Sequence, residues 1–186
     1  MTVMEALTTR RAIRNFRPDR IGRDVLTELA KAATLAPSHM NLQPWAFAIT
    51  DDPATVAKLG HAAKHHLLPR LNKLSPFFHE RDEISAESYD LFYGAPALIV
   101  ICATGDGTLA DMGCNMAAYS LMLAAHSMGL GTCYVSQAQP WLESHDGRRA
   151  LGVPAHYRPI APVIVGVPDA IPLSPGRFDP QIEWIK

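Results

Sequence analysis

The chain carries RRAIRNF at residues 10–16 and PSHMNLQPW at residues 37–45, and these two stretches decide how the rest is interpreted. The first brings three guanidinium groups close together, those of Arg10, Arg11 and Arg14. An arginine fork binds a phosphate or the edge of a conjugated ring, and its charge does not titrate near neutral pH. The second is a polar loop stiffened by two prolines. Together they predict an anion-binding cluster facing a rigid loop, although the arginines alone would also suit a solvated basic turn.

Both stretches resemble the nitroreductase family, whose members bind FMN at a dimer interface and commonly carry Arg-Arg-Ser-x-Arg-x-Phe and then Pro-Ser-x-x-Asn-x-Gln-Pro-Trp. Further matches follow in the family's order: GLGT at 129–132, LGVP at 151–154, an apolar run at 160–167 and then Arg177. The resemblance therefore covers nearly the whole chain. It implies an α+β fold, a three-layer α-β-α sandwich around a central mixed, mostly antiparallel sheet of about four to five strands, in an intertwined homodimer.

The resemblance also implies how the chain is organised. It implies a single nitroreductase-like FMN-binding domain over residues 1–186. Residues 60–95 mix histidines, prolines and charges without a sustained period, so we expect a lid or variable segment there. The proline-rich stretch near the end indicates an extended C-terminal arm over residues 168–186.

Cofactor contacts follow from the resemblance residue by residue. Arg10 and Arg177 would bind the FMN phosphate, and Arg11 the phosphate or ribityl oxygens. Arg14 would meet the pyrimidine edge, where negative charge develops when a hydride reaches flavin N5, so a fixed cation there stabilises the reduced flavin. Ala12 stands where serine is usual, so one ribityl hydrogen bond would be absent or taken over by water.

Two further segments complete the implied cofactor site. The 37–45 loop would reach the FMN of the other subunit, and the segment after GLGT would approach the flavin ring. The residues assigned in this way are Pro37, Ser38, His39, Asn41, Tyr134, Val135, Ser136 and Gln137. The site is then inherently dimeric.

The implied activity is that of an FMN-dependent oxidoreductase that passes electrons from NADH or NADPH to a small conjugated acceptor, of nitroaromatic, quinone or enone type, by a ping-pong mechanism. Because the flavin carries the chemistry, no catalytic side chain and no metal are expected. Phe77, Phe78 and Tyr93 are candidates for the acceptor pocket, with ordinary packing as the alternative. Ser88 and Leu91 stand where oxygen-insensitive bacterial nitroreductases place an asparagine and a lysine, which weakens an assignment to nitro reduction.

A second class of function stays open, that of a flavin-binding protein without nicotinamide-driven turnover, serving flavin storage, sensing or breakdown. Other chemistry is less favoured. Cys102, Cys114 and Cys133 lack metal or redox spacing and are expected to be buried thiols. The histidines at 61–66 could face a metal ion, but no nearby cysteine or carboxylate completes a ligand set. Ser136 could suggest a hydrolase, but the Gly-x-Ser-x-Gly motif around a hydrolase nucleophile is missing.

Composition sets the general class. The 186 residues are 48% apolar and 19% charged, which is typical of a globular protein. The formal net charge is −1, so no broad electrostatic field would attract nucleic acid or anionic lipid. We see no signal peptide and no segment long enough to span a bilayer, so a cytoplasmic protein with no membrane and no nucleic-acid partner is expected.

Local patterns predict the main elements. The predicted strands are residues 45–50, 97–103, 132–137 and 160–167. A helix from about residue 111 to 128 is apolar on nearly all sides, so it must be covered on several sides. We expect it to pack against its copy in a second subunit, with a central core helix of a monomer as the alternative.

Overall fold

The structure is a computed structural model that describes residues 1–71 and 78–185. A four-stranded antiparallel sheet forms its middle layer, in the order β1-β2-β4-β3. The strands are β1 (Trp45–Thr50), β2 (Ala97–Ala103), β3 (Gly131–Tyr134) and β4 (Arg158–Gly166). A parallel bridge between Ala12 and Thr132 adds the N-terminal segment beside β3, so the pairing is mixed but mostly antiparallel, as predicted.

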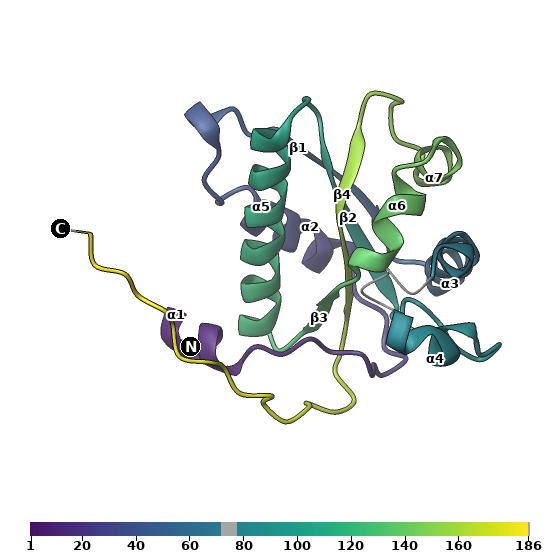
Figure 1. Cartoon of the computed structure of the whole chain (residues 1–186), viewed down its shortest axis with the longest axis horizontal. Coiled ribbons are helices and arrows are strands. Elements are labelled where there is room, and N and C mark those ends of the chain that lie inside the picture. Colours follow the sequence, from purple (N-terminus) through teal and green to yellow (C-terminus); the bar gives the residue numbers. More distant parts are fainter. Residues whose placement is uncertain (72–77, 186) are drawn as a thin grey trace.

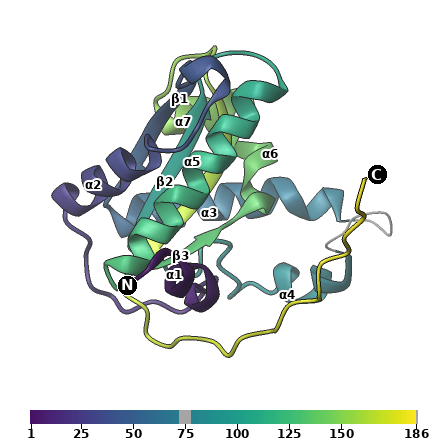
Figure 2. The ribbon, with the colours of Figure 1, turned by 90° about the vertical axis from the view of Figure 1, so that its left-hand side faces the viewer.

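Helices cover both faces of this sheet. They are α1 (Val3–Thr9), α2 (Arg23–Ala33), α3 (Pro53–Leu67), α4 (Arg81–Ser85), α5 (Thr108–Ser127), α6 (Gln139–Leu142) and α7 (His145–Leu151). Short 3-10 turns are η1 (His39–Asn41), η2 (Leu68–Arg70), η3 (Phe78–Glu80) and η4 (Ser136–Ala138). Figure 1 shows α2 and α5 on one side of the sheet and α3, α6 and α7 on the other. In Figure 2, α5 lies in front of the sheet and α3 behind it, which confirms the three-layer α-β-α sandwich.

Local sequence explains how two of the helices start. Thr2 and Glu5 form a capping box, in which Glu5 N donates to Thr2 Oγ1 (3.2 Å) and Thr2 N donates to Glu5 Oε2 (2.6 Å). Asp52 caps α3 by accepting from the backbone of Thr55 (3.1 Å), with Pro53 at the first helical position.

The sheet separates two apolar cores. Ile99 of β2 and Val163 of β4 point with their neighbours toward α2 and α5, whereas Leu98 and Ile164 point toward α3 and α6. All residues of β2 are buried, so the central strands lie between two packed layers. The three cysteines are free and buried, as predicted, and burial raises the pKa of both Cys102 and Cys114 to about 12.

Some predicted boundaries are wrong. The strand predicted at 132–137 ends at Tyr134, because the ladder then meets Pro162 of β4, which has no N–H to donate. Val135 N still donates to Pro162 O (2.9 Å), and the chain turns directly into η4. The last strand begins at Arg158 rather than 160, and the long helix spans Thr108–Ser127 rather than 111–128.

One face of α5 is exposed to solvent. Its exposed apolar residues follow helical spacing and are Leu109, Met112, Met116 and Tyr119. The opposite face is buried against the sheet and α2. The helix is therefore not the fully interior helix of the monomer alternative, because it leaves an apolar stripe uncovered by its own chain.

The N-terminal segment after α1 is fastened to the ends of β3 and β4. Ile13 N donates to Thr132 O (2.9 Å), and Arg17 N donates to Val167 O (2.9 Å). Beyond Pro168 the chain forms no helix or strand up to residue 185 and leaves the three layers as an extended arm (Figures 1 and 2). The large apolar residues of this arm are all exposed: Ile171, Leu173, Phe178, Ile182, Trp184 and Ile185.

A glycine permits the close approach between the arginine segment and β3. A Cβ added at Gly131 would lie 2.8 Å from Cβ of Ile13, so Gly131→Ala must push the segment away. We expect this variant to lower the free energy of unfolding by about 1–3 kcal/mol in urea denaturation. Gly105→Ala is the control, because nothing lies within 4 Å of the added atom, and equal midpoints for the two variants would contradict the prediction.

Candidate functional site

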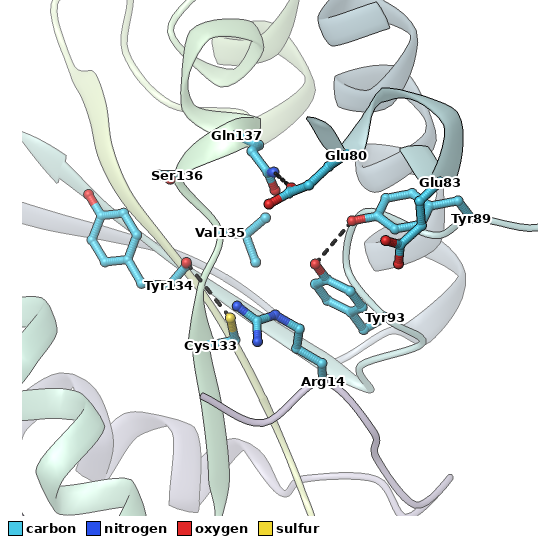
Figure 3. Close-up of a pocket in the computed structure, with 10 residues that line it drawn as sticks. All are labelled: Arg14, Glu80, Glu83, Tyr89, Tyr93, Cys133, Tyr134, Val135, Ser136 and Gln137. Atoms are coloured by element: carbon cyan, nitrogen blue, oxygen red, sulfur yellow. Dashed lines mark hydrogen bonds between the residues drawn. The ribbon is translucent and has the colours of Figure 1, made fainter. Parts of the chain in front are cut away.

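A cavity of 410 Å³ lies beside the end of β3, between the arginine segment, the turn η4 and the residues before β2. Figure 3 shows the ten residues that line it. They are Arg14, Glu80, Glu83, Tyr89, Tyr93, Cys133, Tyr134, Val135, Ser136 and Gln137. Six of them were predicted from the sequence, namely Arg14, Tyr93 and the run 134–137.

Arg14 and two tyrosines form one corner of the cavity. The guanidinium carbon of Arg14 lies 5.8 Å from the ring centroid of Tyr93, in a cation–π contact. The hydroxyls of Tyr89 and Tyr93 lie 3.0 Å apart, and their rings meet edge to face. Arg14 is thus held against an aromatic wall that points into the cavity (Figure 3).

Two carboxylates stand on the same side as the tyrosines. Glu80 of η3 accepts from Gln137 Nε2 at 3.1 Å, a bond that joins the two sides of the cavity mouth. Glu83 of α4 lies beside Tyr89 (Figure 3). Burial raises the pKa of Tyr89, and the hydrogen bond to Tyr93 and the charges of Glu83 and Glu80 act in the same direction. The phenol of Tyr89 therefore stays neutral across the physiological range.

Arg10 and Arg11 line a second cavity of 210 Å³ on the other side of the same segment, together with His126 and Thr132. Arg10 lies 5.9 Å from the ring centroid of Tyr119, and its Nε is buried without a hydrogen-bond partner among the described residues. Burial lowers the pKa of His126, and the charges of Arg10 and Arg11 lower it further. This end of the segment is thus a concentration of positive charge with an unsatisfied donor.

The loop of residues 37–45 lies away from the arginine cluster in the folded chain. Ser38 and Pro44 pack against Gly113, near the start of α5, whereas Thr9 of α1 meets His126 near its end (2.8 Å). His126 lies thirteen residues after Gly113, a separation of about 20 Å along the helix. One chain therefore does not bring Pro37, Ser38, His39 and Asn41 to the arginine cluster.

Arg177, the other predicted phosphate ligand, lines neither of the two cavities. Arg177 is exposed on the arm, where its Nη1 donates to the carbonyl of Gly176 (2.8 Å). Phe77 lies outside the described residues. Phe78 begins η3, but its side chain is not described.

The sequence reasoning missed Lys64, which supports the tyrosine wall from behind. This lysine of α3 is only 6% exposed, and its Nζ donates to the carbonyls of Ala86 (2.6 Å) and Tyr89 (2.9 Å). It also lies 5.8 Å from the ring centroid of Tyr89. A lysine among the buried residues of a helix is a sequence feature that could have drawn attention to it, because a buried charge must be paired or hydrogen-bonded. Glu80, Glu83 and Tyr89 were missed as well.

Metal and membrane features are not found in the described part of the chain. No group of three histidine, cysteine or acidic residues there could hold a metal ion. Nor does any helix of residues 1–71 and 78–185 have the length and apolar character required to cross a bilayer.

A family model and several known proteins match the sequence. A model of the nitroreductase family matches residues 7–167. A protein of Methanothermobacter thermautotrophicus named for NADH dehydrogenase and NAD(P)H nitroreductase activities is 26% identical over 97% of this chain and 85% of its own. The CLA biosynthesis enone reductase of Lactiplantibacillus plantarum is 25% identical over 96% of this chain and 91% of its own.

A solved structure shares the fold. The nitroreductase of Bacteroides fragilis, described with bound FMN, aligns with a TM-score of 0.84 over 100% of both chains at 24% identity. The chain belongs to the nitroreductase family, as its arginine and loop motifs predicted.

Replacing Lys64 tests its supporting role. We expect Lys64→Met to lower the free energy of unfolding by about 1–3 kcal/mol, because two carbonyls lose their donor. Lys58→Met is the matched control, since Lys58 is exposed on the same helix and should change stability by less than about 0.5 kcal/mol. Urea denaturation of both variants measures the difference, and equal effects would show that the buried contacts do not matter.

Proposed function

We propose that this chain is an FMN-dependent oxidoreductase that takes electrons from NADH or NADPH and passes them to a small conjugated acceptor by a ping-pong mechanism. The observation that carries the proposal is the arginine segment, which presents Arg10 and Arg11 to one cavity and Arg14 to the other. When bound, FMN would supply the group that accepts and returns the hydride. Names of relatives that reduce nitro compounds and an enone support an acceptor of this type.

The residues present fit the cofactor. Arg10 Nε is a buried donor that lacks an acceptor in the described part of the chain, and a phosphate dianion would provide one. Arg11 already donates to the carbonyls of Thr8 and Arg10 (both 2.8 Å), so its guanidinium is oriented beside Arg10. Together the two charges would offset the charge of the phosphate, which supports their assignment to that end of FMN.

Arg14 is suited to the opposite end of the ligand. It is the one cation among the ten described residues that line the larger cavity, and the run Tyr134–Gln137 forms the facing wall (Figure 3). A flat ring between them would meet a guanidinium at its polar edge. A positive charge there favours negative charge on the ring, so Arg14 would make reduction more favourable. No protein nucleophile is needed.

We propose that the site is completed by a second copy of the chain. The loop carrying Ser38 and the arginine cluster lie toward opposite ends of α5, so one chain keeps them apart. Two α5 helices packed antiparallel through their exposed stripes would bring the loop of one chain to the arginines of the other. The uncovered apolar arm supports the same arrangement, since its side chains need a partner surface to be buried.

The activity is tested by steady-state oxidation of NADH and NADPH with a quinone acceptor. Parallel double-reciprocal lines at several acceptor concentrations are expected, because a ping-pong cycle has two separate half-reactions. Yellow protein that retains FMN without turnover would instead favour flavin storage, sensing or breakdown. Protein that does not take up FMN would contradict both functions.

Arg14 is tested by its effect on FMN affinity. Arg14→Ala should weaken binding by about 1.5–3 kcal/mol, roughly 10- to 150-fold in Kd, because a hydrogen bond to a charged group is lost. It should also slow flavin reduction. Arg20→Ala is the control, since Arg20 is exposed and does not line the cavity. An unchanged Kd, measured by flavin fluorescence titration, would remove Arg14 from the site.

The shared site predicts that assembly and FMN binding are lost together. Met112→Glu places a charge in the exposed stripe of α5, so we expect a shift toward single chains in light scattering and loss of retained FMN. Ile49→Glu is the control, because Ile49 is an exposed apolar residue on β1. Single chains that keep the cofactor fully would contradict the shared site.

A further inference from the structure

The larger cavity has an acidic wall that the cofactor assignment leaves without a role. Glu80 and Glu83 line it from η3 and α4, on the side away from β3 (Figure 3). The run Tyr134–Gln137 and Arg14 are assigned to the flavin. The carboxylates and tyrosines are therefore available to contact a second ligand that enters the cavity.

The Glu80 carboxylate is exposed, and one hydrogen bond links it to the opposite side of the cavity mouth. It accepts from Gln137 Nε2 (3.1 Å), which bridges the cavity mouth from η4. Glu83 stands beside Tyr89, and both carboxylates contribute to raising the pKa of that phenol. Their negative field therefore reaches the interior of the cavity.

Among the described residues, the charges that line the cavity do not balance. Its ten lining residues include two carboxylates and one guanidinium, that of Arg14, which is already engaged with the ring of Tyr93. Once Arg14 meets the edge of a flavin, the carboxylates face the remaining space without a cation among these lining residues. The rings of Tyr89 and Tyr93 add electron-rich surfaces, which also favour a positive group.

We propose that Glu80 and Glu83 select the electron acceptor by charge, so that neutral and cationic conjugated acceptors are used and those carrying a carboxylate or sulfonate are disfavoured. This inference rests on the proposed oxidoreductase function and adds the class of acceptor. Each carboxylate changes the preference between oppositely charged acceptors roughly fivefold at low salt, because the cavity is open enough for water to screen the interaction.

Three nitrobenzenes that differ only at the para position test the charge preference. They are 4-nitrobenzyl alcohol, 4-nitrobenzoate and (4-nitrobenzyl)trimethylammonium. Each NADPH supplies a hydride, and the solvent a proton, to convert one nitro group into a nitroso group and water. The FMN-loaded protein should show a kcat/KM at least about tenfold higher for the cation than for the anion at low ionic strength, and this ratio should fall as salt is added.

Variants assign the preference to the two carboxylates. Glu80→Gln and Glu83→Gln should each lower the cation-to-anion ratio roughly fivefold, and the double variant should bring it close to one. Asp82→Asn is the matched control, because Asp82 lies on the same helix as Glu83, is equally classed as exposed and does not line the cavity. It should change the ratio less than about twofold, since its charge is farther from the bound acceptor and more of it is screened.

Two outcomes would overturn the inference. One is a ratio near one in the unaltered protein, and the other is a ratio that the double variant leaves unchanged. If the nitro compounds are not reduced, their inhibition constants against quinone reduction give the same ratio. Quinone turnover and retained FMN, measured in every variant, separate this failure from failure of the proposed function, in which the unaltered chain would show no quinone turnover, with or without bound FMN.

Discussion

The burial of β2 and β4 on both faces is the constraint on which the rest of the structure depends. Strands enclosed by α2 and α5 on one side and α3 and α6 on the other carry apolar side chains, because a polar group there would need a buried partner. Polar chemistry is therefore confined to the margin of the sheet. It gathers beyond β3, where the arginine segment, η4 and the residues before β2 converge.

Placing the site at this margin makes its parts depend on one another. Lys64 holds the carbonyls behind the tyrosine wall, the tyrosines hold Arg14, and Gln137 holds Glu80 across the mouth. The cavity is therefore shaped by contacts between segments that have little regular structure of their own. Its geometry is set by the packed helix α3 and the sheet, which act as the rigid support.

Much of the fold could be predicted from local patterns. The strands Trp45–Thr50 and Ala97–Ala103 have the predicted boundaries, because an apolar run is a signal within a few residues. The end of β3 was wrong because it depends on a proline in the neighbouring strand. The family resemblance assigned both Arg14 and residues 134–137 to the flavin, and the structure brings them to one cavity.

The rest of the site carries no local pattern. Lys64 bonds carbonyls 22 and 25 residues away, a pairing that no period in the sequence reveals. Glu80 and Glu83 are the two ends of a run of four consecutive charged residues, so their common direction into a cavity depends on the turn from η3 into α4. Tertiary packing decides long-range contacts of this kind. Propensity and periodicity describe only residues that are close in sequence, so they do not predict such contacts.

The docking of the N-terminal segment has a consequence beyond ligand binding. β3 is the last strand of the sheet, and Ile13 N takes up the outward carbonyl of Thr132. An edge strand with free backbone groups is a template on which another chain can add a strand, a route to aggregation. The segment that carries the arginines thus also closes this edge, so a chain that lost its first residues would become prone to misassembly as well as unable to hold an anion.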